Sequence, residues 1–152
     1  MPLKSPKNKG AAGEREAAEW LQKKFNLEHL PQRNLEQVRF KGKGRVQQGH
    51  DLIGFEPFGI EVKRQEVLSL RTWWRQAKIA AHRSNTPSIP VVMYRQNRKQ
   101  WKFLISANHI GIEVGYLHLE SQEFIDWVNH ILNRIAKGED VCGNIKNLFD
   151  RY

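Results

Sequence analysis

Apolar residues recur at helical spacing in several segments of the chain, and the first segment shows the pattern most clearly. Ala17, Ala18, Leu21 and Phe25 follow one another at intervals of one, three and four residues, which places them on one side of a helix. A later segment ends at Gly138, and glycine favours a helix end. The pattern predicts helices over Ala11 to Phe25, Leu68 to His82, Ser121 to Lys137 and, as a short final helix, Asn144 to Tyr152.

Between the first two helical segments the period changes from that of a helix to that of a strand. In Ile60-Glu61-Val62-Lys63 apolar and charged residues alternate, so Glu61 and Lys63 share one face while Ile60 and Val62 take the buried face. Gly54, Pro57 and Gly59 supply turn residues before this strand. Further strands are predicted over Leu35 to Phe40, Leu52 to Ile53, Pro90 to Tyr94 and Trp101 to Ile105.

Asp51 precedes the short strand Leu52 to Ile53, and a turn between the two strands would set it beside Glu61. Two carboxylates that converge on one point suit magnesium or manganese, which prefer oxygen ligands. Lys63 next to them could stabilise charge on a phosphate oxygen or orient a metal-bound water. Without Asp51, the ordinary interpretation would be an ion pair between Glu61 and Lys63 on a half-exposed strand.

Charge and composition point to the partner. The 152 residues carry a formal net charge of +9, which draws the chain to polyanions such as nucleic acid. The alternative is a basic surface that only confers solubility. Basic residues cluster on both sides of Asp51 and Lys63: Lys4, Lys7, Lys9, Arg33, Arg39, Lys41, Lys43 and Arg45 before Asp51, and Arg64, Arg71, Arg75, Lys78 and Arg83 after Lys63. The loop Lys41 to Arg45 also holds two glycines that permit close approach to phosphates.

Other classes of protein fit the sequence poorly. No apolar stretch approaches the roughly 20 residues that span a membrane, and Met1 to Gly10 lacks the apolar core of a signal peptide. Cys142 is the single cysteine, so an internal disulfide is impossible. We expect one soluble, intracellular domain, with no membrane contact and no small-molecule cofactor.

The order of these segments resembles the PD-(D/E)xK nuclease superfamily, and in detail the archaeal-type Holliday junction resolvases and their phage relatives. The first helix reproduces their Lys-Gly-x-x-x-Glu-Arg-Glu segment in the residues Lys9-Gly10-Ala11-Ala12-Gly13-Glu14-Arg15-Glu16. Asp51-Leu52 matches their Asp-hydrophobic step, and Ile60 to Lys63 matches their Glu-x-Lys strand. The later strands also match, so the resemblance covers about residues 9 to 105. His50 stands where the wider superfamily often has proline.

The resemblance implies an α/β, restriction-endonuclease-like fold, in which helices flank a mixed central sheet. It implies a nuclease core at 11–107, which leaves a basic, flexible segment at 1–10 and a mainly helical C-terminal extension at 108–152 that has no counterpart in the family. Such a chain fits a phage or a prokaryote, so we expect it in the cytoplasm of a prokaryotic cell, or of the host cell if a phage encodes it. Asp51, Glu61 and the Val62 carbonyl would hold Mg²⁺, with Mn²⁺ able to substitute. Glu14 would be a further catalytic glutamate and metal ligand. Glu16 competes for that role, but two residues along a helix are about 200° apart, so only one can face the site.

The implied activity is the resolution of four-way DNA junctions by paired, symmetric cuts that leave 5′-phosphates, and the implied assembly is a homodimer. A same-fold nuclease acting on flaps, nicks or other branched DNA is the alternative, and a DNA-binding protein that does not cut is a third. Lys63 would position the attacking water. Residues expected to contact DNA are Lys9, Arg15, Arg33, Arg39, Lys41, Lys43, Arg45, Arg64 and Gln65, of which Arg15 could instead form an ion pair.

Two further positions have alternative interpretations. His50 could assist a proton transfer, but adjacent strand residues face opposite ways, which favours a packing or hydrogen-bonding role. Trp73 and Trp74 are adjacent on the second helix, so we expect that they cannot both be buried in one core. One of them would then contact a partner subunit or the substrate.

Overall fold

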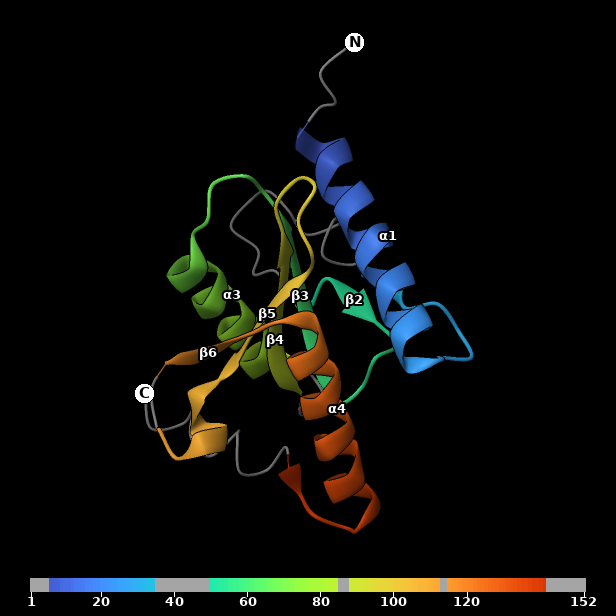
Figure 1. Ribbon diagram of the computed structural model, residues 1–152, viewed down its shortest axis with the longest axis vertical. Helices are drawn as coiled ribbons and strands as arrows, with labels where there is room; N and C mark the ends of the chain where they lie inside the picture. Colours follow the sequence, from blue (N-terminus) through green and yellow to red (C-terminus); the bar gives the residue numbers. More distant parts are fainter. Residues whose placement is uncertain (1–5, 35–49, 85–87, 113–114, 142–152) are drawn as a thin grey trace.

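The computed structural model describes residues 6–34, 50–84, 88–112 and 115–141 (Figure 1). Three helices lie in this part of the chain: α1 (Pro6–Phe25), α3 (Leu70–Arg83) and α4 (Ser121–Ala136). A short 3₁₀ helix, η1, covers Ala107–Ile110. None of the described helices combines the length and the apolar character that a membrane crossing requires.

Six strands of the described residues form one mixed sheet in the order β1-β2-β3-β4-β5-β6. Strands β3 and β4 are parallel, because α3 connects them and returns the chain to the end of the sheet at which β3 begins. The other pairs are antiparallel. In the register of the parallel pair, Glu61 lies beside Val92 and Arg64 beside Arg95. The strands are β1 (Gln32–Arg33), β2 (Leu52–Ile53), β3 (Phe58–Arg64), β4 (Ile89–Arg95), β5 (Lys102–Ser106) and β6 (Tyr116–Leu119).

Helices cover both faces of the sheet, with α3 on one side and α1 and α4 on the other (Figure 1). The alternation along β4 builds both cores: Val91 and Met93 belong to the cluster under α1 and α4, whereas Val92 and Tyr94 pack with α3. Every residue of β4 from Ile89 to Tyr94 is buried, as expected for a central strand with helices on both faces.

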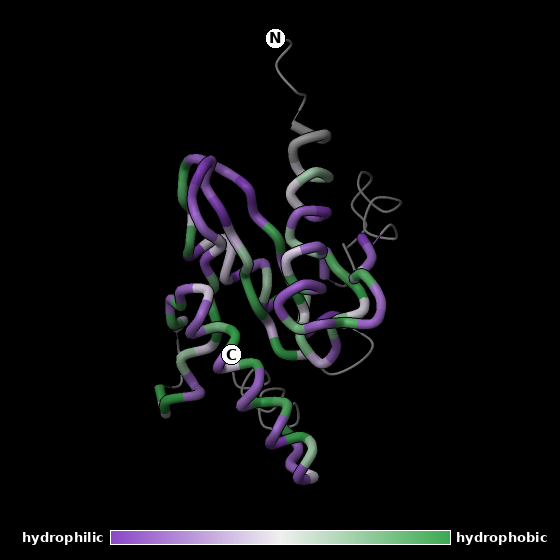
Figure 2. The backbone as a smooth tube through the Cα atoms, turned by 45° about the vertical axis from the view of Figure 1, so that its right-hand side comes forward, coloured by the Kyte–Doolittle hydropathy of each residue, from purple (hydrophilic) through white to green (hydrophobic). Residues whose placement is uncertain are grey.

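Helix α4 contributes buried side chains to the hydrophobic core on the face of the sheet that it shares with α1. Its Phe124 ring stacks on Phe103 of β5, with ring centres 3.8 Å apart. Apolar and polar residues alternate around α4 in the hydropathy view, as an amphipathic helix requires (Figure 2). A capping box of Glu120 and Glu123 begins the helix, and Gly138, with φ of 85°, lies just beyond its end.

The structure confirms the predicted helices over 11–25, 68–82 and 121–137 with small shifts at their ends. Helix α1 begins at Pro6, five residues before the predicted start at Ala11. Gly13 is buried, and a Cβ there would come within 3.0 Å of Arg64, so this glycine lets α1 approach β3 closely. Strand β6 was not predicted; it pairs with β5, so the segment after residue 108 contributes to the central sheet as well as a helix.

The expectation for the two tryptophans of α3 was wrong. Trp73 and Trp74 are 3% and 4% exposed and belong to the same core cluster. Neighbouring side chains on a helix diverge by about 100°, and the broad sheet face under α3 accommodates both directions. Trp73 packs near Tyr94 of β4, and Trp74 packs near Tyr116 of β6. Neither indole is available to a partner subunit or to DNA.

Several predictions fall outside the described residues. They concern the strand over Leu35 to Phe40, the basic loop Lys41 to Arg45 and the final helix Asn144 to Tyr152, together with Cys142.

Candidate active site

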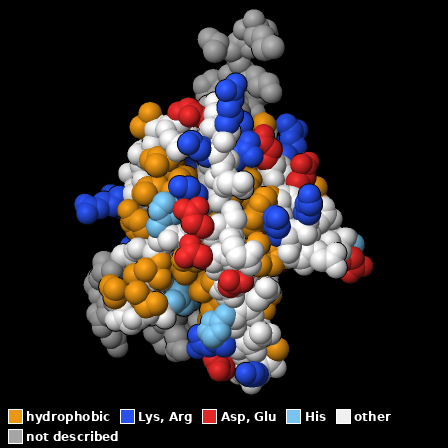
Figure 3. All heavy atoms as spheres, viewed as in Figure 1, with side chains coloured by type: hydrophobic (Ala, Val, Ile, Leu, Met, Phe, Trp, Pro, Cys, Tyr) orange, Lys and Arg blue, Asp and Glu red, His pale blue; other side chains and the backbone are white. Residues whose placement is uncertain are grey.

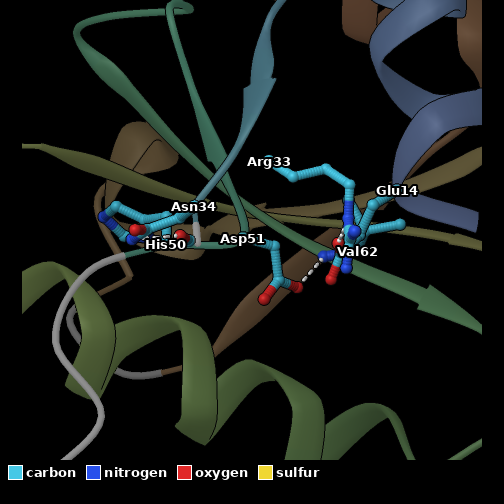
Figure 4. Close-up of polar contacts among 6 residues, drawn as sticks. All are labelled: Glu14, Arg33, Asn34, His50, Asp51 and Val62. Atoms are coloured by element: carbon cyan, nitrogen blue, oxygen red, sulfur yellow. Dashed lines mark hydrogen bonds and ion pairs between the residues drawn. The ribbon is translucent and has the colours of Figure 1, made fainter. Parts of the chain in front are cut away.

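Asp51 is held at the edge of β3 by its main chain and its side chain. Its N–H donates to the Ile60 carbonyl (3.0 Å), and its Oδ2 accepts from the Val62 N–H (2.7 Å) (Figure 4). The antiparallel register, in which Leu52 lies opposite Ile60, brings the residue before β2 to this point. Asp51 and Glu61 are each 7% exposed, and the negative charge of Asp51 raises the pKa of Glu61, so the two carboxylates share a place that largely excludes water.

Glu61 and Lys63 extend from the same face of β3, the face covered by α3. Ile60 and Val62 take the other face and join the core under α1 and α4, as the alternation predicted. The Lys63 Nζ lies 3.7 Å from the Glu61 Oε1. Burial, the negative charge of Asp51 and a smaller effect of Glu14 raise the pKa of Glu61 to about 8, although Lys63 opposes the rise. One lysine therefore does not compensate the buried carboxylates.

Glu14 approaches this group from α1. Its carboxylate pairs with Arg33 of β1, and its charge acts on Glu61. Glu16 lies on a different side of α1, where its Oε2 is 3.3 Å from both the Arg64 Nε and an Arg95 guanidinium nitrogen. The rotation of the helix thus directs Glu14 toward the strand pair that carries Asp51, and directs Glu16 toward β4.

Asn34 follows β1 and brackets the segment that carries Asp51. Its N–H donates to the Asp51 carbonyl and its Nδ2 donates to the His50 carbonyl, both at 2.9 Å (Figure 4). Because Arg33 pairs with Glu14, these two consecutive residues connect the α1 glutamate to the aspartate segment. The sequence analysis missed Asn34, since no local pattern links it to a residue 16 positions later.

His50 has the packing and hydrogen-bonding role that its strand position favoured. Its ring lies over Gly59, where a Cβ would come within 1.9 Å of the His50 Nε2, and this nitrogen shares a hydrogen bond with the Ser88 Oγ (2.7 Å). Burial lowers the pKa of His50 to about 4, so the ring is neutral at pH 7. A neutral ring packed against Gly59 and bonded to Ser88 fixes the segment without adding charge to the site.

The donor atoms fit a divalent cation. No three His, Cys, Asp or Glu side chains within the described ranges lie close enough together to hold a metal ion. The fit therefore rests on two carboxylates and a main-chain oxygen. In a strand the N–H and C=O of one residue face the same side, so the Val62 carbonyl faces the same edge as the N–H that binds Asp51. Mg²⁺ commonly takes one or two carboxylates and keeps several waters.

The family model described as "Phage putative PDDEXK endonuclease" matches residues 5–138. The chain belongs to this family. The matched residues include β6 and α4, which lie beyond residue 105, where the motifs recognised in the sequence end. Both elements therefore belong to the region that the family shares. The mixed sheet with helices on both faces agrees with the α/β fold that the superfamily resemblance implied. No protein of curated function and no solved structure matches this chain.

The residues expected to contact DNA in this PDDEXK endonuclease differ in their surroundings. Arg15 and Gln65 are exposed. Arg33 and Arg64 are engaged with Glu14 and Glu16, which indicates a positioning role for both. Nothing is described for the side chain of Lys9, and Arg39, Lys41, Lys43 and Arg45 lie outside the described residues.

Proposed function

We propose that this protein is a metal-dependent DNA endonuclease whose active site comprises Asp51, Glu61 and Lys63, with Glu14 as a fourth member. The observation that carries the proposal is the burial of Asp51 and Glu61 side by side, with a lysine amine 3.7 Å from Glu61. Two buried carboxylates repel each other, and a bound cation relieves that repulsion. A chain with a net charge of +9 is attracted to a polyanion.

Each residue has a distinct role in the proposed reaction. Asp51, Glu61 and the Val62 carbonyl would hold Mg²⁺, or Mn²⁺ in its place, and Glu14 would bind the cation through a water. The cation, when bound, makes a coordinated water more acidic and stabilises charge on the phosphate. Lys63 orients the attacking water or stabilises the negative charge that develops on a phosphate oxygen. Attack at phosphorus with loss of the 3′ oxygen leaves a 5′-phosphate.

The proposed substrate is a four-way DNA junction, cut at two symmetric positions by a homodimer. Support comes from the Lys9 to Glu16 segment of α1, which resembles the junction resolvases and supplies Glu14. A junction has two-fold symmetry, and a two-fold dimer would present one Asp51 site to each of two strands. Recognition of shape and backbone charge is sufficient for a branch point.

A panel of DNA structures tests this proposal. A synthetic four-way junction is incubated with the protein beside a matched duplex, a flap, a nicked duplex and a single strand, in magnesium and in chelator. The proposal predicts magnesium-dependent, paired symmetric nicks on the junction at a rate above that on the controls. Faster cleavage of flaps or nicks would identify a nuclease for another branched DNA. Binding without cleavage of any DNA would contradict the proposal that the protein is an endonuclease.

A further inference from the structure

A pocket of about 520 Å³ lies between the C-terminal half of α1 and the turn that joins β4 to β5. One wall is formed by Glu16, Glu19, Trp20 and Lys23, which follow one face of α1 at helical spacing. The other is formed by residues of the turn, among them Arg95, Arg98, Lys99 and Trp101. The volume lies within the range of roughly 300–1,000 Å³ that is usual for sites that bind small ligands.

The pocket is positive. Four cationic side chains line it against two glutamates, and one of these, Glu16, is also paired with Arg64 outside the pocket. Lys23, Arg98 and Lys99 are exposed and form no ion pair with any other described residue. Figure 3 shows Lys and Arg side chains along α1 and over the neighbouring turn, with acidic side chains among them. Such a rim suits a phosphate.

Behind the rim, the wall combines aromatic and cationic surface. Trp20 is half-buried against Phe103, with the ring centres 5.2 Å apart. The Arg95 guanidinium lies 5.5 Å from the centre of the Trp101 ring, and its buried Nε has no hydrogen-bond partner among the described residues. Trp101 is 3% exposed and supports Arg95 from behind, whereas the half-buried Trp20 ring leaves indole surface beside the cations, against which a base can stack.

The pocket is close to the proposed active site. Arg64 follows Lys63 and pairs in register with Arg95, so the Cα atoms of Lys63 and Arg95 are separated by one residue along the strand and one strand spacing across the sheet, or about 6 Å. Lys63 faces α3 and Arg95 faces α1, so a strand would pass around the C-terminal ends of β3 and β4 to reach both. A paired duplex is too wide and stiff for such a path, whereas one unpaired strand can follow it.

We infer that this pocket binds one nucleotide of an unpaired DNA strand, with its base against Trp20 and its phosphate among Lys23, Arg98 and Lys99. The inference rests on the proposed function for the identity of the strand as substrate DNA. Under the proposed function, the unpaired strand is one that separates from its complement at the branch point of the junction, within a few nucleotides of the cut.

Binding of a fluorescein-labelled oligothymidylate in chelator tests the pocket without cleavage. Lys23→Ala/Lys99→Ala removes two rim charges, and Lys24→Ala/Lys137→Ala removes two exposed lysines that do not line the pocket. The first double variant should bind roughly tenfold more weakly, and the slope of log affinity against log salt should fall by about 1.4, as for two lost contacts to a single strand. The control variant should change affinity less than about twofold.

A second probe locates the base. An oligonucleotide that carries 5-iododeoxyuridine, crosslinked by light and mapped by mass spectrometry, should mark Trp20. Crosslinks confined to other residues, or equal losses of affinity in the two double variants, would overturn the inference. Thymidine 5′-monophosphate that binds as tightly as the oligonucleotide would also overturn it, because the pocket would then be a mononucleotide site.

The outcomes separate this inference from the proposed function. If wild-type protein cuts DNA in magnesium but the two double variants bind single strands equally, the pocket assignment fails and the enzyme assignment stands. If no DNA is cut but only the pocket variant loses single-strand affinity, the enzyme assignment fails and the pocket stands.

Discussion

Gly59 and His50 show how single positions shape the site. The His50 ring occupies the space that a side chain at residue 59 would need, and the ring is held by Ser88. His50 is adjacent to Asp51, so displacement of the ring would move the segment that carries the aspartate.

Gly59→Ala is therefore expected to destabilise the fold by about 1–3 kcal/mol, the usual cost of overpacking. Denaturant unfolding measures this change. Gly10→Ala is the matched control, because nothing lies within 4 Å of a Cβ there and the residue is within α1. The control should be neutral or gain up to about 1 kcal/mol from helix propensity. Equal effects of the two substitutions would contradict the packing account.

The raised pKa of Glu61 should make the stability of the metal-free protein depend on pH. Its pKa is raised to about 8 by burial and by Asp51, whereas the unfolded chain ionises Glu near its ordinary value of 4.5. Between these pH values the folded protein retains a proton that the unfolded chain has lost. The free energy of unfolding should thus fall as the pH rises from about 4.5 to about 8, and level off above that.

Urea unfolding in chelator at about pH 5 and about pH 8 measures the decline, and Glu61→Gln should remove most of it. An equally steep decline in that variant would assign the titration to another group. The same proton competes with a metal ion, so metal affinity should increase as the pH rises toward about 8.

At the residue scale, the sequence was sufficient for Asp51, Glu61 and Lys63, because strand alternation and a short turn determine their placement. The roles of these residues in catalysis remain predictions. The DNA contact expected of Arg33 stays a prediction, but its ion pair with Glu14 was not foreseen, and Asn34 was not singled out. Both depend on contacts between segments distant in sequence, which local periodicity does not report.

Among the elements, β1 is the shortest described strand together with β2, yet it connects two parts of the site. Arg33 pairs with Glu14 of α1, and Asn34 binds the carbonyls of His50 and Asp51. Through these contacts, β1 and Asn34 connect α1 to the segment that carries Asp51.

Loss of the Asn34 side-chain contact should affect metal binding more than folding. Asn34→Ala is expected to cost about 1 kcal/mol of stability, the value of one hydrogen bond, and to lower the cleavage rate roughly tenfold or more through misplacement of Asp51. The half-saturating magnesium concentration should rise. Gln32→Ala is the control, since its exposed side chain donates to the Leu30 carbonyl and, among the described residues, to no other group. A matching loss in Gln32→Ala would contradict a specific role for Asn34.

Helix α4 gives the second prediction at this scale. Phe124→Ala should destabilise the protein by about 3–5 kcal/mol, because the ring is fully buried and stacks on Phe103. Leu132→Ala, on the exposed side of α4, should cost less than about 1 kcal/mol. Denaturant unfolding of both variants measures the difference. Similar, small effects would mean that α4 is a dispensable extension.

The helices and strands that were predicted from the sequence are those with a clear periodic pattern of apolar residues. Long amphipathic helices and the buried strands β3, β4 and β5 were recognisable, because each repeats one pattern over five or more residues. Strand β6 has four residues, only partly buried, and so carried too weak an alternation to be recognised. The burial of both Trp73 and Trp74 depends on the breadth of the sheet beneath α3, which is a tertiary property.

At the scale of the whole molecule, a buried acidic site is combined with a net charge of +9. Basic residues attract the phosphate backbone to the surface, and under the proposed function a cation held by the carboxylates would offset their negative charge toward one phosphate. The family match and the fold agree on an endonuclease, and the charge agrees with a nucleic acid. The choice of DNA structure depends on surfaces outside the motif residues, which explains why sequence motifs alone did not determine it.

The central claim is that Asp51 holds a metal ion that hydrolyses DNA, and Asp51→Asn tests it most directly. Asparagine retains an oxygen that can accept from the Val62 N–H but lacks the charge that a cation needs. The measurement is single-turnover cleavage of a four-way junction in magnesium, beside junction binding in chelator, for wild type and variant. We predict unchanged binding and a loss of cleavage of roughly a hundredfold or more. Cleavage by Asp51→Asn at the wild-type rate would contradict the proposed site.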